Sequence, residues 1–86
     1  MPTISRFYGI QIRMFFDDKH GPHFHANYAE FRAQVSIADG TILAGDLPPH
    51  AKKLVQEWRR LHRRELLENW ERARRQESLV DIEGLS

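Results

Sequence analysis

Two histidines separated by one residue carry the most obvious chemistry of this chain. His23 and His25 flank Phe24 in the segment Pro22-His23-Phe24-His25-Ala26. Residues two apart on a β-strand project from the same face, so both imidazoles would point away from the core if Phe24 packs inward. Two adjacent imidazoles can bind a metal ion, or they can share acid and base roles in phosphodiester cleavage.

Each of these activities would need further residues. His20, Asp17 and Asp18 lie just upstream and could complete a metal site with His23 and His25, although this spacing is not specific for metal binding. No nucleophile or orienting carboxylate can be assigned to the pair. The simplest interpretation is that both histidines hydrogen-bond cross-strand neighbours and shape a binding surface. We therefore expect no cofactor and no dedicated metal site.

The strand face that carries the histidines would also carry cationic and aromatic side chains. Its binding-surface candidates are Arg13, Phe15, His23, His25 and Arg32, interspersed with Gln11, Asn27, Gln34 and Ser36. Arginine and an aromatic ring can contact the backbone and bases of RNA, and both are enriched at protein–protein interfaces. When helices cover one face of a sheet, the other face is exposed to solvent in any case. This exposure accounts for the polar residues but not for Phe15.

The N-terminal part of the chain alternates as a β-strand does. In residues 3–16 the even positions carry apolar side chains, namely Ile4, Tyr8, Ile10, Ile12, Met14 and Phe16. Arg6 is the exception, and Gly9 is a candidate bulge. Further candidate strands cover residues 23–28, 31–37 and 41–44.

The dipeptide Asp39-Gly40 is typical of a hairpin turn between the last two candidate strands. We expect this turn to bring Ile37 close to Ile42. The apolar residues near the end of the chain, Leu79, Val80 and Ile82, could form a last short strand or an extended strap.

Two apolar stripes at helical spacing follow Pro48-Pro49, which can open a helix. The first stripe contains Ala51, Leu54, Val55, Trp58 and Leu61, and the second contains Leu66, Leu67, Trp70 and Ala73. At 3.6 residues per turn the second stripe lies roughly 120° around the helix from the first. One straight helix cannot direct both stripes at one sheet, so we expect a break near residues 62–64. Both tryptophans are expected in the core.

Strands followed by helices predict an α+β fold. We expect a three- to four-stranded antiparallel sheet followed by two C-terminal helices packed on one face. The chain should form a single domain, 1–86, with the sheet in 1–45, the helices in 46–76 and a C-terminal extended segment in 77–86. A core drawn from 86 residues is small, so a partner protein or a homodimer would help to stabilise it.

Composition and charge exclude several classes of protein. The chain has no cysteine, so disulfides and thiolate zinc sites are excluded. We expect no membrane helix, because no run approaches about 20 apolar residues, and no signal peptide, which favours a cytoplasmic location.

The net charge is +1, but residues 50–76 carry nine Lys or Arg and four Glu. This block is either a solvated helix face or a surface for RNA or an acidic partner.

Several segments of the chain resemble one bacterial family. They are the start Met-Pro-Thr-Ile-Ser-Arg-Phe-Tyr-Gly-Ile, Ile12-Arg13-Met14-Phe15-Phe16, Pro22-His23-Phe24-His25-Ala26, and the residues Trp58, His62, Glu65-Leu66 and Asn69-Trp70. The sequence is similar to members of the family called domain of unknown function 4160. This resemblance implies no particular reaction. It implies a gene that lies beside a second small gene, in pairs that look like toxin–antitoxin modules.

Three hypotheses for the function stay open at this point. The leading one is a small interaction module, one component of a two-gene toxin–antitoxin-like pair, whose partner protein is encoded nearby. The second is a small metal-independent ribonuclease toxin that uses His23 and His25, with RNA as its substrate. The third is a metal-binding accessory protein, with His20, His23 and His25 as weak candidate ligands. The first leads because no complete catalytic constellation is visible.

Overall fold

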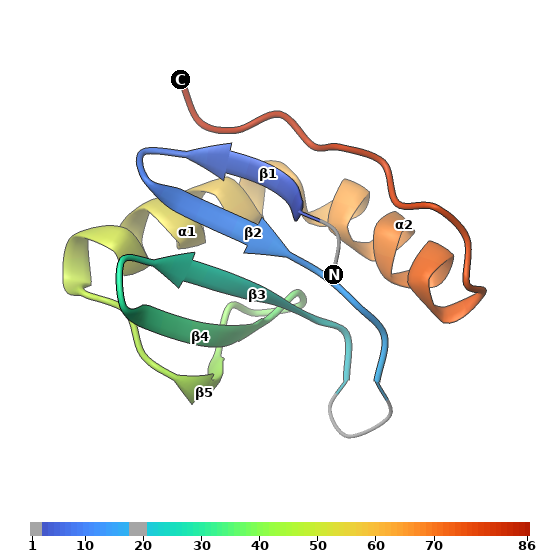
Figure 1. Cartoon of the computed structure of the whole chain (residues 1–86), viewed down its shortest axis with the longest axis horizontal. Helices are drawn as coiled ribbons and strands as arrows, with labels where there is room; N and C mark the ends of the chain where they lie inside the picture. Colours follow the sequence, from blue (N-terminus) through green and yellow to red (C-terminus); the bar gives the residue numbers. More distant parts are fainter. Residues whose placement is uncertain (1–2, 18–20) are drawn as a thin grey trace.

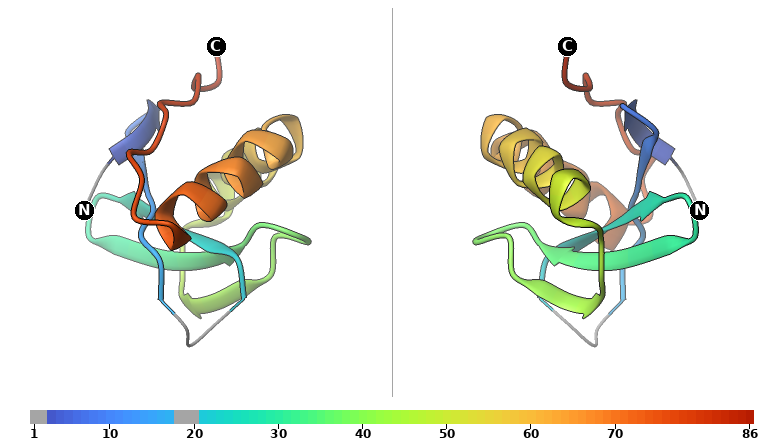
Figure 2. Two further views of the ribbon diagram at one scale, coloured as in Figure 1. Left: turned by 90° about the vertical axis from the view of Figure 1, so that its right-hand side faces the viewer. Right: turned by 90° about the vertical axis from the view of Figure 1, so that its left-hand side faces the viewer.

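The computed structural model describes residues 3–17 and 21–86 and has an α+β fold (Figure 1). Five strands form one antiparallel sheet and lie in the order of the chain, where the sequence predicted three or four strands. Two consecutive helices follow and cover one face of the sheet (Figure 2). The elements are β1 (Thr3–Phe7), β2 (Ile10–Arg13), β3 (His23–Tyr28), β4 (Phe31–Ser36), β5 (Ile42–Gly45), α1 (Pro49–Leu61) and α2 (Arg63–Arg74).

The additional strand arises because residues 3–16 contain a hairpin rather than one long strand. Tyr8 and Gly9 form the turn, and both have positive φ angles, 49° and 79°. A tight two-residue hairpin turn of type I′ requires this combination. A register shift within β1 changes its alternation, so that Phe7 faces the core and Arg6 faces solvent. Gly9 is therefore a turn residue and not a bulge.

The Asp39-Gly40 turn joins β4 to β5, as the sequence predicts. Gly40 has a φ angle of 79°, which favours glycine. The connection is wider than a two-residue turn, and the register pairs Val35 with Ile42. The cross-strand partner of Ile42 is therefore Val35 rather than Ile37, whose side chain is buried in the core just after β4.

The two helices meet at His62, within the predicted break, where φ is −118° and ψ is 21°. The stripe of α1 packs on the sheet through Ala51, Val55 and Trp58. Leu61 was predicted in this stripe but is 66% exposed, because the chain changes direction directly after it. Neither described helix is long and apolar enough to span a lipid bilayer.

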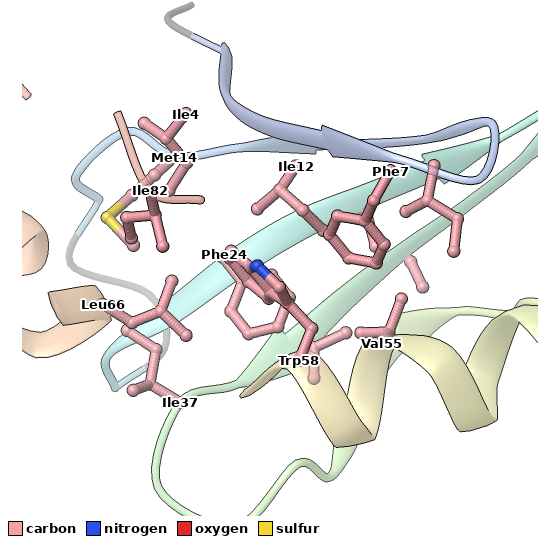
Figure 3. Packing of buried hydrophobic residues seen from close by; sticks show 14 of the residues in the cluster. Ile4, Phe7, Ile12, Met14, Phe24, Ile37, Val55, Trp58, Leu66 and Ile82 are labelled. Atoms are coloured by element: carbon pink, nitrogen blue, oxygen red, sulfur yellow. The ribbon is translucent and has the colours of Figure 1, made fainter. Parts of the chain in front are cut away.

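Both tryptophans belong to the core, as predicted, and Figure 3 shows Trp58 among the other buried side chains. Trp58 is fully buried, and its ring centroid lies 5.3 Å from that of Phe7 and 5.7 Å from that of Phe24. Its Nε1 donates a hydrogen bond to the backbone oxygen of Glu83 at 2.9 Å. Trp70 of α2 is 6% exposed. The core therefore lies between the sheet and both helices.

Residues 77–86 form an extended strap that passes first beside α2 and then along β1 (Figure 1). The backbone N–H of Ile82 donates to the backbone oxygen of Ile4 at 2.7 Å. The side chain of Asn69 in α2 donates to the backbone oxygen of Val80 at 2.8 Å and accepts a hydrogen bond from its N–H at 2.9 Å. The strap thus covers the edge of the sheet that β1 would otherwise expose.

Candidate functional site

We call the face of the sheet that the helices leave uncovered the outer face. The strand register sets Arg13 of β2, His25 of β3 and Gln34 of β4 side by side across it. The next row contains Gln11, Asn27 and Arg32. Phe24 and Ala26, which alternate with these positions in β3, are fully buried on the helix side. Three of the five predicted binding residues, Arg13, His25 and Arg32, therefore share one face.

Phe15 also lies beside His25, but its ring is not open on both sides. The two ring centroids are 4.6 Å apart and the ring planes are inclined by 18°. This stacking covers one face of the phenyl ring with the imidazole. Phe15 therefore supports His25, and a nucleobase could reach only its remaining face.

His23 lies elsewhere than predicted, because it is fully buried. Its ring packs 5.2 Å from the Trp70 ring of α2 and 5.3 Å from the His25 ring. His23 is the first residue of β3, and at this end of the strand Trp70 reaches the side chain and excludes water. The expectation that both imidazoles point into solvent is therefore wrong for His23.

The buried ring of His23 has a polar neighbour at each nitrogen. Its Nδ1 lies 3.0 Å from the backbone oxygen of Gly21 and donates to it, because a carbonyl oxygen can only accept. Its Nε2 lies 3.5 Å from a carboxylate oxygen of Asp17. Asp17 was predicted as a metal-ligand candidate, whereas its carboxylate is the charged neighbour of His23. The side chain of His23 thus lies between those of Asp17 and His25.

The environment of His25 disfavours its charged form. Burial lowers the pKa of His25 below its usual value of 6.5, and His23 and Arg13 lower it further, while Asp17 acts in the opposite direction. His25 is therefore neutral at neutral pH, and one of its ring nitrogens can accept a hydrogen bond.

An open hollow of about 270 Å³ lies beside His25 on the outer face. It is lined by His25, Arg32, Ala33, Gln34, Ala44 and Gly45. Two buried polar atoms, His25 Nε2 and Gln34 Oε1, have no hydrogen-bond partner among the described residues. Polar atoms in this state are uncommon in folded proteins, so these two distinguish His25 and Gln34 among the residues that line the hollow.

The sequence did not identify Gly45 as part of this site, because the last candidate strand ends at residue 44. Gly45 has a φ angle of 73°, and a Cβ there would lie 2.0 Å from the backbone oxygen of Arg32. Only glycine permits this close approach of β5 to β4. Its position in a Gly-Asp segment after an alternating strand was the available signal.

The structure assembles no metal site from the predicted candidates that it describes. Among residues 3–17 and 21–86, no three His, Cys, Asp or Glu side chains gather closely enough to hold a metal ion. Two of the proposed ligands, His20 and Asp18, lie outside the described residues.

Comparison with known proteins connects the site with a family. The model of the family described as Domain of unknown function (DUF4160) matches residues 9–71, which run from the first turn to α2 and include the whole candidate site. No curated protein and no solved structure matches the chain. Because the match covers most of the sequence, this protein belongs to the DUF4160 family.

Proposed function

We propose that the protein is a non-catalytic interaction module whose outer face binds a small partner protein. We further propose that the two form a two-gene pair of the toxin–antitoxin type, which rests on the resemblance described above. The binding role is supported by one observation above all: two residues that line the hollow, His25 and Gln34, each have a buried polar atom without a hydrogen-bond partner among the described residues. A ligand that satisfies them removes the cost of burying polar groups without hydrogen bonds.

The chemistry of the hollow indicates which groups such a partner presents. Gln34 Oε1 accepts a hydrogen bond, and His25 Nε2 donates or accepts one according to its tautomer. A peptide group or a side-chain carboxamide offers a donor and an acceptor together and can satisfy both atoms. The exposed guanidinium of Arg32 borders the same hollow and suits a carboxylate of the partner.

A ribonuclease is the second candidate function, and one observation favours it. The Asp17 carboxylate beside His23 resembles the carboxylate that orients a catalytic imidazole. The interaction module remains the leading proposal, because His23 is fully buried and only His25 borders the hollow. A mechanism that uses both histidines needs both rings at the substrate.

The proposal is tested by co-expressing the protein with the small protein encoded by the adjacent gene and measuring the dissociation constant of the purified complex. We expect Arg32→Glu to weaken the complex at least tenfold. Lys53→Glu is the matched control, because Lys53 is an exposed cation on α1, on the other side of the molecule. Reversal of its charge should change the dissociation constant little.

Failure to form a complex, or equal effects of both variants, would contradict the proposal. Cleavage of RNA by the wild-type protein in the presence of a chelator, and its loss in His25→Asn, would establish the ribonuclease instead.

A further inference from the structure

A second surface lies where the two helices meet, away from the outer face. We call it the elbow surface. It is an open hollow of about 590 Å³, lined by Arg60, Leu61, Arg63, Arg64, Leu67, Glu68 and Glu71. Among the described residues, Leu61 is the most exposed large apolar side chain. Leu67, one of the predicted core positions, is only partly buried beside it. Apolar side chains gathered in a hollow and rimmed by charges are typical of interaction sites.

The charges of the elbow surface are unfavourable for the isolated protein. Arg60, Arg63 and Arg64 are exposed, and none of them forms an ion pair within the part of the chain that the structure describes. Arg63 and Arg64 occupy the first turn of α2, where the helix dipole is positive and disfavours cations. The acidic residue of this turn, Glu65, is 2.6 Å from the ring of His62. Anionic groups from another molecule would reverse this unfavourable arrangement.

We propose that the elbow surface binds an acidic amphipathic helix of a partner protein. Apolar side chains of that helix enter the hollow against Leu61 and Leu67, and its carboxylates face the three arginines. The elbow is built from two helices and has no free strand edge, so a bound segment must satisfy its own backbone hydrogen bonds, as a helix does. This inference does not depend on the function proposed for the outer face.

Two other occupants fit the elbow surface less well. A nucleic acid would place phosphates near Glu68 and Glu71 and would leave the leucines without an apolar partner. A second copy of the chain would bring the same three arginines against each other. Glu71 could not offset them, because it is engaged by Arg74 of its own helix at 2.7 Å, and Glu68 is one carboxylate against three arginines. Charge complementarity therefore selects an acidic partner with apolar anchors.

The probe for this proposal is a synthetic helical peptide with leucines at positions i, i+4 and i+7 and glutamates on both flanks. Binding is measured by fluorescence anisotropy. We expect the peptide to bind with a dissociation constant below about 100 μM. The substitution Leu61→Ala and the double substitution Arg63→Glu with Arg64→Glu should each weaken binding at least tenfold. These residues are exposed, so the fold should persist, which circular dichroism checks. Arg32→Glu, on the outer face, should leave peptide binding unchanged.

Three outcomes would overturn the proposal. The first is equal binding of control peptides that carry lysine in place of glutamate or alanine in place of leucine. The second is binding of single-stranded RNA that displaces the peptide and is insensitive to Leu61→Ala, which would make the elbow a nucleic-acid surface. The third is a concentration-dependent dimer that Arg64→Glu alters, which would assign the elbow to a second copy of the chain.

Discussion

At the level of single residues, two neighbouring histidines have different surroundings and therefore different properties. The pKa of His25 lies below its usual value of 6.5 because of burial and the proximity of His23 and Arg13. At pH values between the pKa of His25 in the folded protein and its higher pKa in the unfolded chain, His25 binds more protons in the unfolded state. The contribution of His25 to stability is thus fully present above about pH 6.5 and is lost as the pH falls through the pKa of the folded state.

We predict that His25→Asn makes the free energy of unfolding less dependent on pH between pH 7 and pH 5. Urea titrations at several pH values measure this slope for both proteins. An NMR titration of the wild type should also give His25 a pKa below 6.5. An unchanged slope together with an ordinary pKa would show that the surroundings of His25 are not those described.

Trp58 is the residue whose truncation should cost most. It contacts Phe7 and Phe24 and also binds the strap through Glu83. Trp58→Ala should lower the free energy of unfolding by about 3–5 kcal/mol. That loss is comparable with the whole stability of many small domains. Trp58→Phe, which keeps an aromatic ring, should cost less, and an unaltered melting temperature for the alanine variant would contradict burial of the ring.

At the level of elements, the hairpin of β1 and β2 is built with an unfavourable turn residue. Tyr8 has a φ angle of 49° and is 57% exposed, so its ring contributes little packing while its backbone occupies the left-handed region. Asparagine tolerates this region better than tyrosine does. Tyr8→Asn should therefore raise the free energy of unfolding by about 1 kcal/mol.

Tyr8→Phe is the control for this prediction, because it keeps both the ring and the backbone strain and should leave stability unchanged. Equal melting temperatures for all three proteins would show that the turn carries no strain.

The same hairpin shows how far local patterns predict this fold. Asp39-Gly40 was recognisable because its turn chemistry is contained in two residues, and the break at His62 followed from the angle between two apolar stripes. Tyr8-Gly9 was missed because tyrosine is uncommon in such turns, so the alternation on either side looked continuous. Arg6 interrupts the alternation because the register of β1 shifts between Thr3 and Ser5, and this interruption was the only sign of that shift in the sequence.

At the level of the whole molecule, the sequence predicted only those parts of the site that depend on which side chains share one face of the sheet. The register alone sets Arg13, His25 and Arg32 together, and the sequence contains that information. The burial of His23 depends on Trp70 of α2, and the hollow depends on the close approach of Gly45 to Arg32. Such contacts join segments far apart in the chain, and a single sequence without its fold does not reveal them.

The strap has a further consequence, for the rates of folding and unfolding. The contact between Ile4 and Ile82 closes a loop of almost the entire chain, and closing long loops slows folding. We expect this contact to form after the transition state. Asn69→Ala removes both side-chain hydrogen bonds to Val80 and should cost about 2 kcal/mol. Stopped-flow measurements should show this loss as a roughly thirtyfold faster unfolding rate with a nearly unchanged folding rate. A slower folding rate would place the strap in the folding nucleus instead.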